Sequence, residues 1–309
     1  MDSSQQYQVV CYGEVLWDIL PTGPLPGGAP VNVAYHLKRL GYNPAVITKI
    51  GLDNYGKELI AFFSSTGIVT NYFDVDYEHP TGLVYATVNQ QNEASYDIVF
   101  PSAWDFIQWN EEYMQLLQSS KYFVYGSLTS RNQDSRNTLM HLLEAANTKV
   151  FDINLRPPHF RRTNIEYLLA KADILKMNSS ELEQVTGWFS NLKTTEDRIQ
   201  LIQDRFQIET IIITKGADGA LVNQQGIIYN HPGFSVTVAD TIGSGDSFLA
   251  GYLYQLLKGA NTSDALDFAS GIGAFIATKP GACPDYTISA ISEFIESSST
   301  KHTTIFHNQ

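Results

Sequence analysis

The chain has 309 residues, of which 43% are hydrophobic and 17% are charged, as in a globular protein with a sizeable core. The formal net charge of −12 argues against a nucleic-acid or acidic-membrane partner. Because the N-terminus is polar and no apolar stretch is long enough to span a membrane, we expect a soluble cytoplasmic protein. The two cysteines, Cys11 and Cys283, have no zinc-site spacing and are expected to be reduced thiols.

Strands and helices are expected to alternate at the start of the chain. An apolar strand is predicted at Val9–Tyr12 and another at Ala45–Ile50. Between them a Gly- and Pro-rich crossing leads to Pro30, a residue suited to the first turn of a helix that ends at Gly41. A second helix is expected near Tyr55–Ser65.

The pattern changes between Asn71 and Phe100. Three strands are predicted there, at Phe73–Asp76, Gly82–Val88 and Ala94–Phe100, with polar turns between them. Because no helix intervenes, we expect these strands to pair antiparallel in a small sheet apart from the main one.

Alternation returns beyond Trp109. The predicted strands are Tyr122–Tyr125, Val150–Ile153, Ile174–Met177 and Thr210–Thr214, followed by a hairpin of Ala220–Asn223 and Gly226–Tyr229. The predicted helices are Glu111–Gln118, Asp134–Ala146, Ile165–Ala170, Ser180–Val185, Thr195–Phe206, Gly245–Leu257, Ser263–Ala277 and Ile288–Ile295. This alternation predicts an α/β protein with a mostly parallel sheet covered on both faces.

One domain over residues 1–296 is therefore expected, with β-rich lid insertions at about 16–27 and 71–101. Residues 297–309 are polar and are expected to form an unstructured tail. Ligands of parallel α/β sheets bind outside the carboxyl ends of the strands, so polar groups that follow strands deserve most weight.

The strongest such signal runs from Val238 to Tyr252. A short apolar strand is predicted to pass Gly243, Ser244 and Gly245 and to enter an apolar helix, so that backbone N–H groups and the helix dipole form an anion site. Asp246 follows directly. It either caps the helix or acts as a general base beside a phosphate in transfer, and the turn alone favours the cap.

Other candidates are weaker when taken singly. Gly28 would allow close approach of a ligand, Asn32 carries an amide in the first helical turn, and Asp18 could accept from a vicinal hydroxyl pair. All three are equally typical of a loop with local hydrogen bonds. Arg156, held before two prolines, either neutralises a phosphate or forms a surface salt bridge.

Asn178 and Glu181 suit a hydrated Mg²⁺ shell, but their spacing also predicts a capping box. The turn Thr214–Gly219 fits a nucleotide phosphate contact or a plain hairpin. The segment Gly51–Glu58 nearly matches a P-loop but lacks its final hydroxyl residue, so we predict a turn before a helix. Polar groups at several strand ends along one sheet edge nevertheless form what phosphoryl transfer requires.

In combination, these motifs resemble the ribokinase-type (PfkB) family of carbohydrate kinases over roughly Val9–Ile295. The stretches that carry the resemblance are Gly27–Ala34, Asp240–Asp246, Gly51-x-Asp53-x-x-Gly56, Asn178-x-x-Glu181 and Thr214–Gly219. Within the family, Gly13–Asp18 and Asp152-x-Asn154-x-Arg156-Pro157 are most similar to fructokinases.

The resemblance implies a ribokinase-like αβα three-layer fold with a small β-sheet lid, and a homodimer formed through that lid. It implies ATP, Mg²⁺ and an activating K⁺, and phosphorylation of D-fructose to fructose 6-phosphate. Two alternatives stay open: a family kinase for ribose, 2-keto-3-deoxygluconate or a nucleoside, and a non-catalytic sugar-binding regulator.

The resemblance also implies roles for single residues. Asp246 matches the general base, and the amides of Gly243, Ser244 and Gly245 match the anion hole. The sugar contacts are Asp18, Gly28, Asn32 and Asp246, with Arg156 shared between sugar and phosphate. The nucleotide contacts are Asn178, Thr214, Gly216, Gly219 and Ser270. Asn178 and Glu181 match the Mg²⁺–phosphate motif, and Asp240, Ile242 and Gly281 match the K⁺ site.

Overall fold

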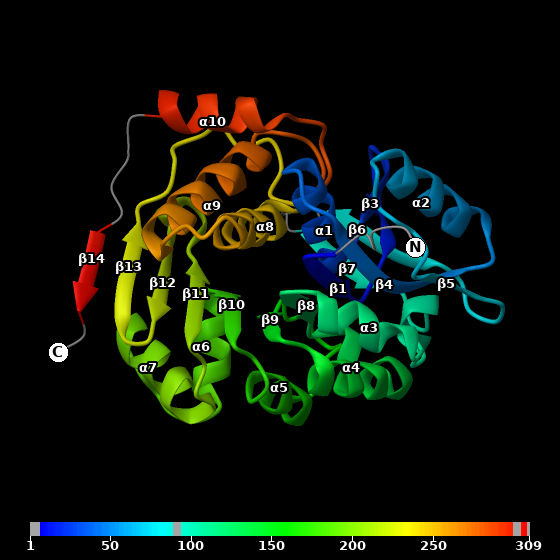
Figure 1. Ribbon diagram of the computed structural model, residues 1–309, viewed down its shortest axis with the longest axis horizontal. Coiled ribbons are helices and arrows are strands. Elements are labelled where there is room, and N and C mark those ends of the chain that lie inside the picture. The colour runs from blue at the N-terminus through cyan, green and yellow to red at the C-terminus, as the bar shows by residue number, and fades with distance from the viewer. Residues whose placement is uncertain (1–6, 89–93, 299–303, 308–309) are drawn as a thin grey trace. The chain divides into compact units, whose positions relative to one another are not determined.

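The computed structural model describes residues 7–88, 94–298 and 304–307 (Figure 1). These residues form two compact units. The first unit comprises residues 1–147 together with Gly281–Cys283, and the second comprises 148–280 and 284–309. None of the helices in the described ranges has both the length and the apolar composition that a membrane span requires.

The first unit is built on a parallel sheet. Its strands are β8 (Tyr122–Gly126), β1 (Val9–Tyr12), β4 (Pro44–Gly51) and β5 (Phe73–Asp76), in that spatial order. Its helices are α1 (Ala29–Arg39), α2 (Asn54–Ser65), α3 (Glu112–Ser119) and α4 (Gln133–Ala145). Figure 1 shows α1 and α2 on one side of this sheet and α3 and α4 on the other. Every residue of β1 is buried, as expected of a central parallel strand covered on both faces.

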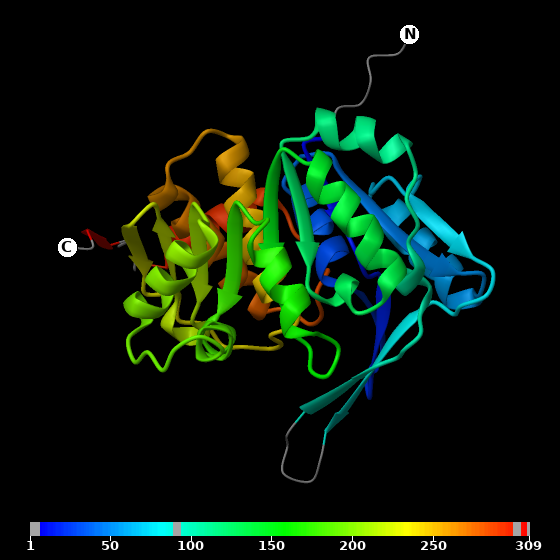
Figure 2. The same cartoon turned by 90° about the horizontal axis from the view of Figure 1, so that it is seen from below.

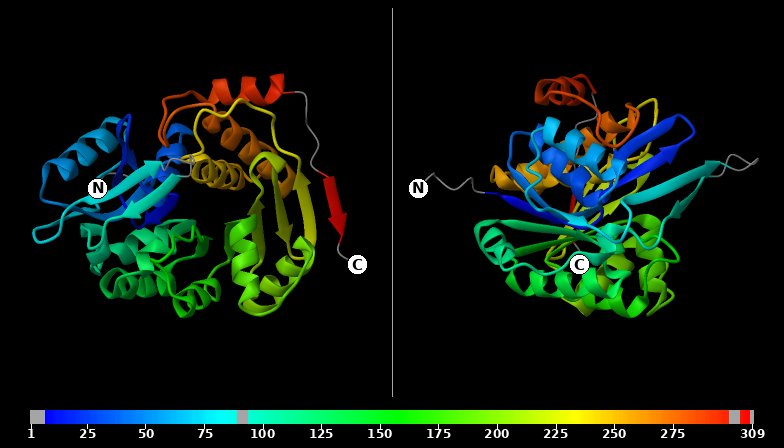
Figure 3. Two further views of the ribbon diagram at one scale, coloured as in Figure 1. Left: turned by 180° about the vertical axis from the view of Figure 1, so that it is seen from behind. Right: turned by 90° about the vertical axis from the view of Figure 1, so that its right-hand side faces the viewer.

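A second, four-stranded sheet in this unit matches the predicted lid. Its order is β3 (Gly23–Gly27), β2 (Leu16–Leu20), β6 (Gly82–Val88) and β7 (Ala94–Ile98). Figures 2 and 3 show β6 and β7 extending away from the helices of their unit. The lid sheet thus combines both predicted insertions, of which residues 89–93 lie outside the described ranges.

One detail of the lid prediction is wrong. Phe73–Asp76 does not join the small sheet: it pairs parallel with β4, because α2 supplies the crossover that a parallel neighbour needs. β2, for which no pairing was predicted, runs parallel to β6. These two strands are far apart in the chain, which leaves room for a crossover between them. β6 and β7 pair antiparallel as predicted, and β2 and β3 also pair antiparallel.

The second unit continues the same architecture. Its strands are β9 (Thr148–Asp152), β10 (Ile174–Asn178), β11 (Thr210–Thr214), β12 (Ala220–Gln224), β13 (Ile227–His231) and β14 (Thr304–His307). Its helices are α5 (Arg162–Leu169), α6 (Ser179–Gly187), α7 (Thr195–Phe206), α8 (Ser244–Leu257), α9 (Thr262–Ala277) and α10 (Ile288–Ser297). β9, β10 and β11 are parallel, and β12 and β13 form the predicted hairpin. Figure 1 shows α6 and α7 on one face of this sheet and α8 and α9 on the other.

Two predictions about the second unit are also wrong. The tail was expected to lack structure, yet Thr304–His307 pairs antiparallel with β13, whose outer edge accepts a further strand. The short strand predicted at Val238 is absent, and residues 232–241 form neither helix nor strand. The N–H groups of Ala239 and Asp240 instead donate to the Ala277 carbonyl at the end of α9, at 2.9 and 3.3 Å.

Asp53 joins the main sheet region to the lid within the first unit. Its carboxylate caps α2 through the Gly56 N–H at 2.8 Å and accepts from the N–H and hydroxyl of Thr81 at 2.8 and 2.7 Å. Thr81 directly precedes β6 and in turn accepts from the Gly51 N–H at 3.0 Å. The turn Gly51–Glu58 is therefore a capped helix start, as predicted, and the glycines of this motif serve this close packing.

We predict that Thr81→Val lowers the free energy of unfolding by about 1–3 kcal/mol, because the buried Gly51 N–H and the Asp53 carboxylate both lose a partner. Denaturant unfolding measures the effect. Thr70→Val, which removes only an exposed contact with Ser64, is the matched control and should change stability by less than about 0.5 kcal/mol. Equal stability of the two variants would contradict this role of Thr81.

Candidate functional site

A cavity of about 670 Å³ in the second unit gathers the residues that were predicted on the nucleotide side. Its volume is typical of small-molecule sites. All five of those predicted residues line it: Asn178, Thr214, Gly216, Gly219 and Ser270. They come from β10, β11, the turn after β11 and α9, so residues far apart in the chain meet around one space.

The strand register explains part of this meeting. Asn178 and Thr214 are the last residues of β10 and β11, and they pair directly in the parallel ladder. The turn that follows β11 passes Gly219, whose φ is +81° and whose missing Cβ would collide with the backbone of residues 231–233. Only glycine fits this position, because both the backbone angle and the space exclude a side chain.

The remaining wall is mostly apolar, and the sequence predicted no ligand contact for its residues. They are Phe234, Val236, Val238, Phe248, Ala274 and Ala277. They lie in the irregular segment after β13 and on α8 and α9. In this wall the Ser270 hydroxyl is buried, and no residue in the described part of the chain hydrogen-bonds to it. A buried hydroxyl without a partner costs stability, so this group is suited to a polar ligand atom.

The glycine turn lies at the same cavity. Gly243, with φ +73°, is the residue before α8, and Ser244 and Gly245 line the cavity as the first residues of that helix. The start of α8 therefore presents free N–H groups and a positive dipole end to the cavity. The Ser244 N–H also contacts the Thr241 carbonyl at 3.3 Å, so one of the three predicted anion-hole amides is shared with the turn.

Asn178 and Glu181 form the predicted capping box at the start of α6. The Asn178 side chain accepts from the Glu181 N–H at 2.9 Å, and Glu181 Oε2 accepts from the Asn178 N–H at 2.8 Å. Glu181 Oε1 accepts from the Leu155 N–H at 2.8 Å. Burial raises the pKa of this carboxyl above its ordinary value despite these bonds. Both oxygens are already used, so Glu181 fits a water-mediated Mg²⁺ role better than direct ligation.

Lys176 was given no role by the sequence analysis, yet it is buried two residues before Asn178. Its ammonium donates to Asp152 Oδ2 on the neighbouring strand β9 at 2.7 Å. Burial lowers the pKa of Lys176, but Asp152, Asp246 and Glu181 raise it more, so the pKa lies above its ordinary value. A buried lysine within a strand of apolar residues gives no periodic signal that would single it out.

The other residues predicted in this unit are placed less decisively. Arg156 is exposed on the loop after β9, and its Nη1 donates to the Leu155 carbonyl at 3.2 Å. It is not among the residues that line the cavity. Asp240 and Ile242 belong to one turn, where the Ile242 N–H donates to Asp240 Oδ1 at 3.0 Å. The K⁺ assignment stays a prediction.

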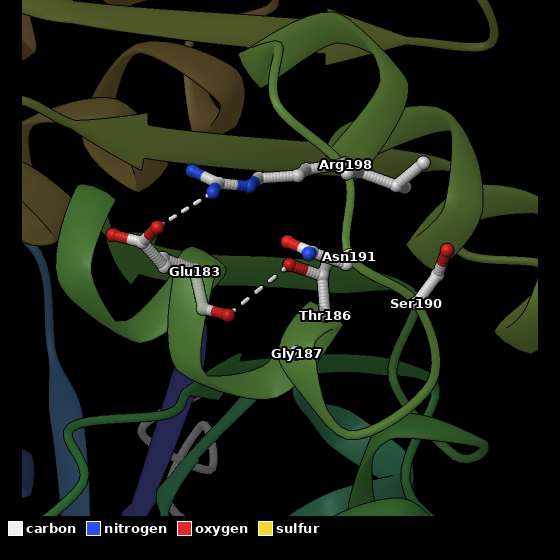
Figure 4. A pocket seen from close by; sticks show the side chains of 7 residues that line it. Glu183, Thr186, Gly187, Ser190, Asn191 and Arg198 are labelled. Atoms are coloured by element: carbon white, nitrogen blue, oxygen red, sulfur yellow. Dashed lines mark hydrogen bonds and ion pairs between the residues drawn. The ribbon is translucent and has the colours of Figure 1, made fainter.

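A second cavity, of about 140 Å³, lies between the end of α6 and α7 (Figure 4). The side chains of Arg198, Glu183 and Thr186 already have partners. Arg198 Nη2 pairs with Glu183 Oε1 at 2.6 Å, and the Thr186 hydroxyl donates to the Leu182 and Glu183 carbonyls at 2.7 and 3.3 Å. Because of its small size and these internal bonds, we assign it no ligand.

In the first unit, the three predicted sugar residues gather where the lid meets α1. Asp18 lies on β2, and a Cβ on Gly27 would collide with its carboxylate. Gly28, with φ +121°, directly precedes α1, and a Cβ there would strike the Glu14 carbonyl. Asn32 follows in the first turn and is 4% exposed. The sequence thus identified three neighbouring polar or close-approach positions.

The segment Gly281–Cys283 completes this region of the first unit. The Cys283 thiol contacts Asn32 Oδ1 at 3.4 Å, and the ring Nε2 of His36 lies 2.9 Å from the Ala282 carbonyl. Burial lowers the pKa of His36 to about 3, although the bond to Ala282 raises it. A neutral, buried histidine therefore holds this segment against α1.

Comparison with known proteins identifies the family. The chain matches the model of the pfkB family of carbohydrate kinases over residues 22–288. It belongs to this family. As a PfkB protein it is a phosphotransferase that acts on a sugar hydroxyl.

Fructokinases are among the relatives of this PfkB protein. It is 30% identical to a fructokinase of Escherichia coli over 292 residues, which cover 87% of this chain and 93% of that protein. It is similar to the crystal structure of a Vibrio cholerae O395 fructokinase in its fructose-, ADP- and calcium-bound form, with a TM-score of 0.82, 26% identity and coverage of 94% and 100%. It also resembles the Salmonella enterica aminoimidazole riboside kinase complexed with aminoimidazole riboside and an ATP analogue, with a TM-score of 0.78, 26% identity and coverage of 93% and 99%. These likenesses confirm the predicted ribokinase-like αβα fold.

We predict that acid destabilises the protein partly through His36. Its pKa is depressed in the folded chain, so the unfolded chain takes up a proton as pH falls below about 6.5, and stability is lost from there down towards pH 3. His36→Gln, which cannot titrate, should lose less stability than wild type between pH 7 and 5. Unfolding midpoints at both pH values measure this, with exposed His141→Gln as the control. The same pH response in wild type and His36→Gln would contradict the assignment.

Proposed function

We propose that this kinase transfers the γ-phosphoryl group of ATP to D-fructose and produces ADP and fructose 6-phosphate. The observation that supports ATP as the phosphate donor is that the glycine turn and five predicted nucleotide residues meet around one cavity. The fructose half rests on the likeness to fructokinases, including a structure whose description names fructose and ADP. The Gly13–Asp18 motif supports the same acceptor.

The cavity suggests how the nucleotide would be divided between its walls. Its apolar wall, with the unpartnered Ser270 hydroxyl, suits a purine base with a polar edge. The strand ends at Asn178 and Thr214 and the start of α8 suit the phosphates. Mg²⁺ bound with the nucleotide would neutralise phosphate charge, and Asn178 and Glu181 would orient its waters.

In this proposal Asp246 is the general base that takes the proton of the attacking sugar hydroxyl. The N–H groups of Gly243, Ser244 and Gly245 stabilise the negative charge on the phosphoryl group in transfer. Asp18, Gly28 and Asn32 bind the sugar, and Arg156 offsets phosphate charge. Phosphoryl transfer needs little covalent help from protein, so charge and position account for most of the catalysis.

A second acceptor class has its own support. The aminoimidazole riboside kinase is as similar in sequence, at 26%, as the Vibrio fructokinase. Ribose, 2-keto-3-deoxygluconate and nucleosides therefore remain rival acceptors within the family. A non-catalytic regulator is disfavoured because Asp246 and both glycines of the turn are retained.

A substrate panel tests the acceptor. Purified protein with ATP and Mg²⁺ is assayed for ADP release with fructose, ribose, 2-keto-3-deoxygluconate, adenosine and aminoimidazole riboside. We expect kcat/KM for fructose to exceed the others by at least about tenfold, as a site built for hydroxyl contacts permits. A higher value for another acceptor would contradict fructose and leave the kinase assignment intact.

The role of Asp246 is tested by Asp246→Asn. We expect kcat to fall by about 10²–10⁴-fold through loss of general-base catalysis, while ATP affinity measured by calorimetry changes little. Asp264→Asn, a change in the first turn of the neighbouring helix α9, is the matched control and should keep wild-type kcat. An Asp246→Asn variant with most of its activity would remove this residue from the mechanism.

A further inference from the structure

The buried ion pair of Lys176 and Asp152 lies outside the roles assigned above. Lys176 is 6% exposed and Asp152 4% exposed, and the two residues face each other across the register of β10 and β9. Burying two charges costs several kcal/mol per ion, so such a pair is often no more stabilising than two well-packed apolar residues. Stability is therefore a weak reason for a charged pair at this place.

The position of the ammonium points to the glycine turn. A Cβ built on Gly245 would lie 3.3 Å from Lys176 Nζ, closer than a methyl group and an ammonium normally approach. Gly245 belongs to the first turn of α8 and, unlike Gly243, does not have a positive φ. Its backbone angles therefore do not require glycine. The space taken by the Lys176 ammonium gives a physical reason for glycine at this position.

Several negative groups surround this one cation. Asp152 holds it directly, and the carboxylates of Asp246 and Glu181 also act on it electrostatically. A phosphoryl group at the start of α8 would add further negative charge beside Asp246. In a low-dielectric interior, a fixed positive charge offsets such charge without reorganisation during the reaction.

We propose that Lys176 is a positioning residue for phosphoryl transfer. Its ammonium, anchored by Asp152, packs against Gly245. There its positive charge adds to that of the glycine turn at the start of α8 and offsets the negative charge of Asp246. It acts through the turn, since it is not among the residues that line the cavity. Asp152 is the anchor that fixes the direction of the ammonium. This inference rests on the proposed kinase function of the same site.

The test compares Lys176→Met, which keeps an unbranched side chain one atom shorter and removes the charge, with Lys149→Met as a matched control. Lys149 lies on β9 and pairs with Asp173 at 3.5 Å, away from the glycine turn. For Lys176→Met we expect kcat for fructose to fall by about 100-fold, the scale for losing one preorganised charge or donor. KM for ATP and for fructose should change less than about threefold, a split that general loosening of the fold would not produce. Lys149→Met should keep wild-type kcat.

A double-mutant cycle tests the contact between Gly245 and the Lys176 ammonium. Gly245→Ala should lower kcat in the wild-type background, because its methyl group displaces the ammonium, and should add much less to Lys176→Met. Additive losses would overturn the proposal, as would a wild-type kcat in folded Lys176→Met. If Lys176→Met does not fold, Asp152→Asn carries the test, with a reduced kcat expected and an unchanged kcat overturning the proposal. A wild-type protein that phosphorylates no sugar contradicts the proposed function instead.

Discussion

The parallel register of β10 with β9 and β11 is the constraint on which the candidate nucleotide site depends. It sets Asn178 opposite Thr214 and Lys176 opposite Asp152. Parallel strands bring their carboxyl ends to one edge, and the loops that leave that edge can then collect around a ligand. The cavity depends on this alignment, because Asn178, Thr214 and the turn up to Gly219 are ends and turns of those strands, and α8 and α9 supply further parts of its wall.

Several residues in this region combine folding and candidate chemical roles. Asn178 and Glu181 complete a capping box, and Asn178 also lines the cavity. The glycine turn begins α8 and lines the cavity with Ser244 and Gly245. A helix start leaves N–H groups without intrahelical partners, and these same groups bind anions. A structural and a functional reading of such a motif therefore need not exclude each other.

The sequence predicted the alternation of elements and most helix and strand positions, because apolar periodicity and turn residues are local signals; it did not predict β2 and β3 as separate strands. It also predicted five of the residues that line the cavity: Asn178, Thr214, Gly216 and Gly219 lie at strand ends or in the turn that follows, and the family resemblance implied Ser270. Long-range pairing was harder. The parallel partner of Phe73–Asp76 and the strand formed by Thr304–His307 depend on sheet edges that no local pattern reveals.

Contacts between residues that are distant in the chain were also not predicted. In the sequence, Lys176 is one polar residue in a mostly apolar strand. Only the fold shows that Asp152 and Gly245 lie beside its ammonium. Phe234 and Val236 belong to an irregular segment, and only the fold places them against α9 as part of the cavity wall. The short strand predicted before the glycine turn does not form, because the N–H groups of Ala239 and Asp240 donate to the Ala277 carbonyl.

The most direct test of phosphoryl transfer is phosphorus NMR of the reaction of purified protein with ATP, Mg²⁺ and fructose. The signal of the γ-phosphate should disappear while ADP and a sugar phosphomonoester appear in equal amounts, with the ester phosphorus coupled to the two protons on C6. Release of inorganic phosphate without a sugar ester, or an unchanged ATP spectrum, would contradict the account.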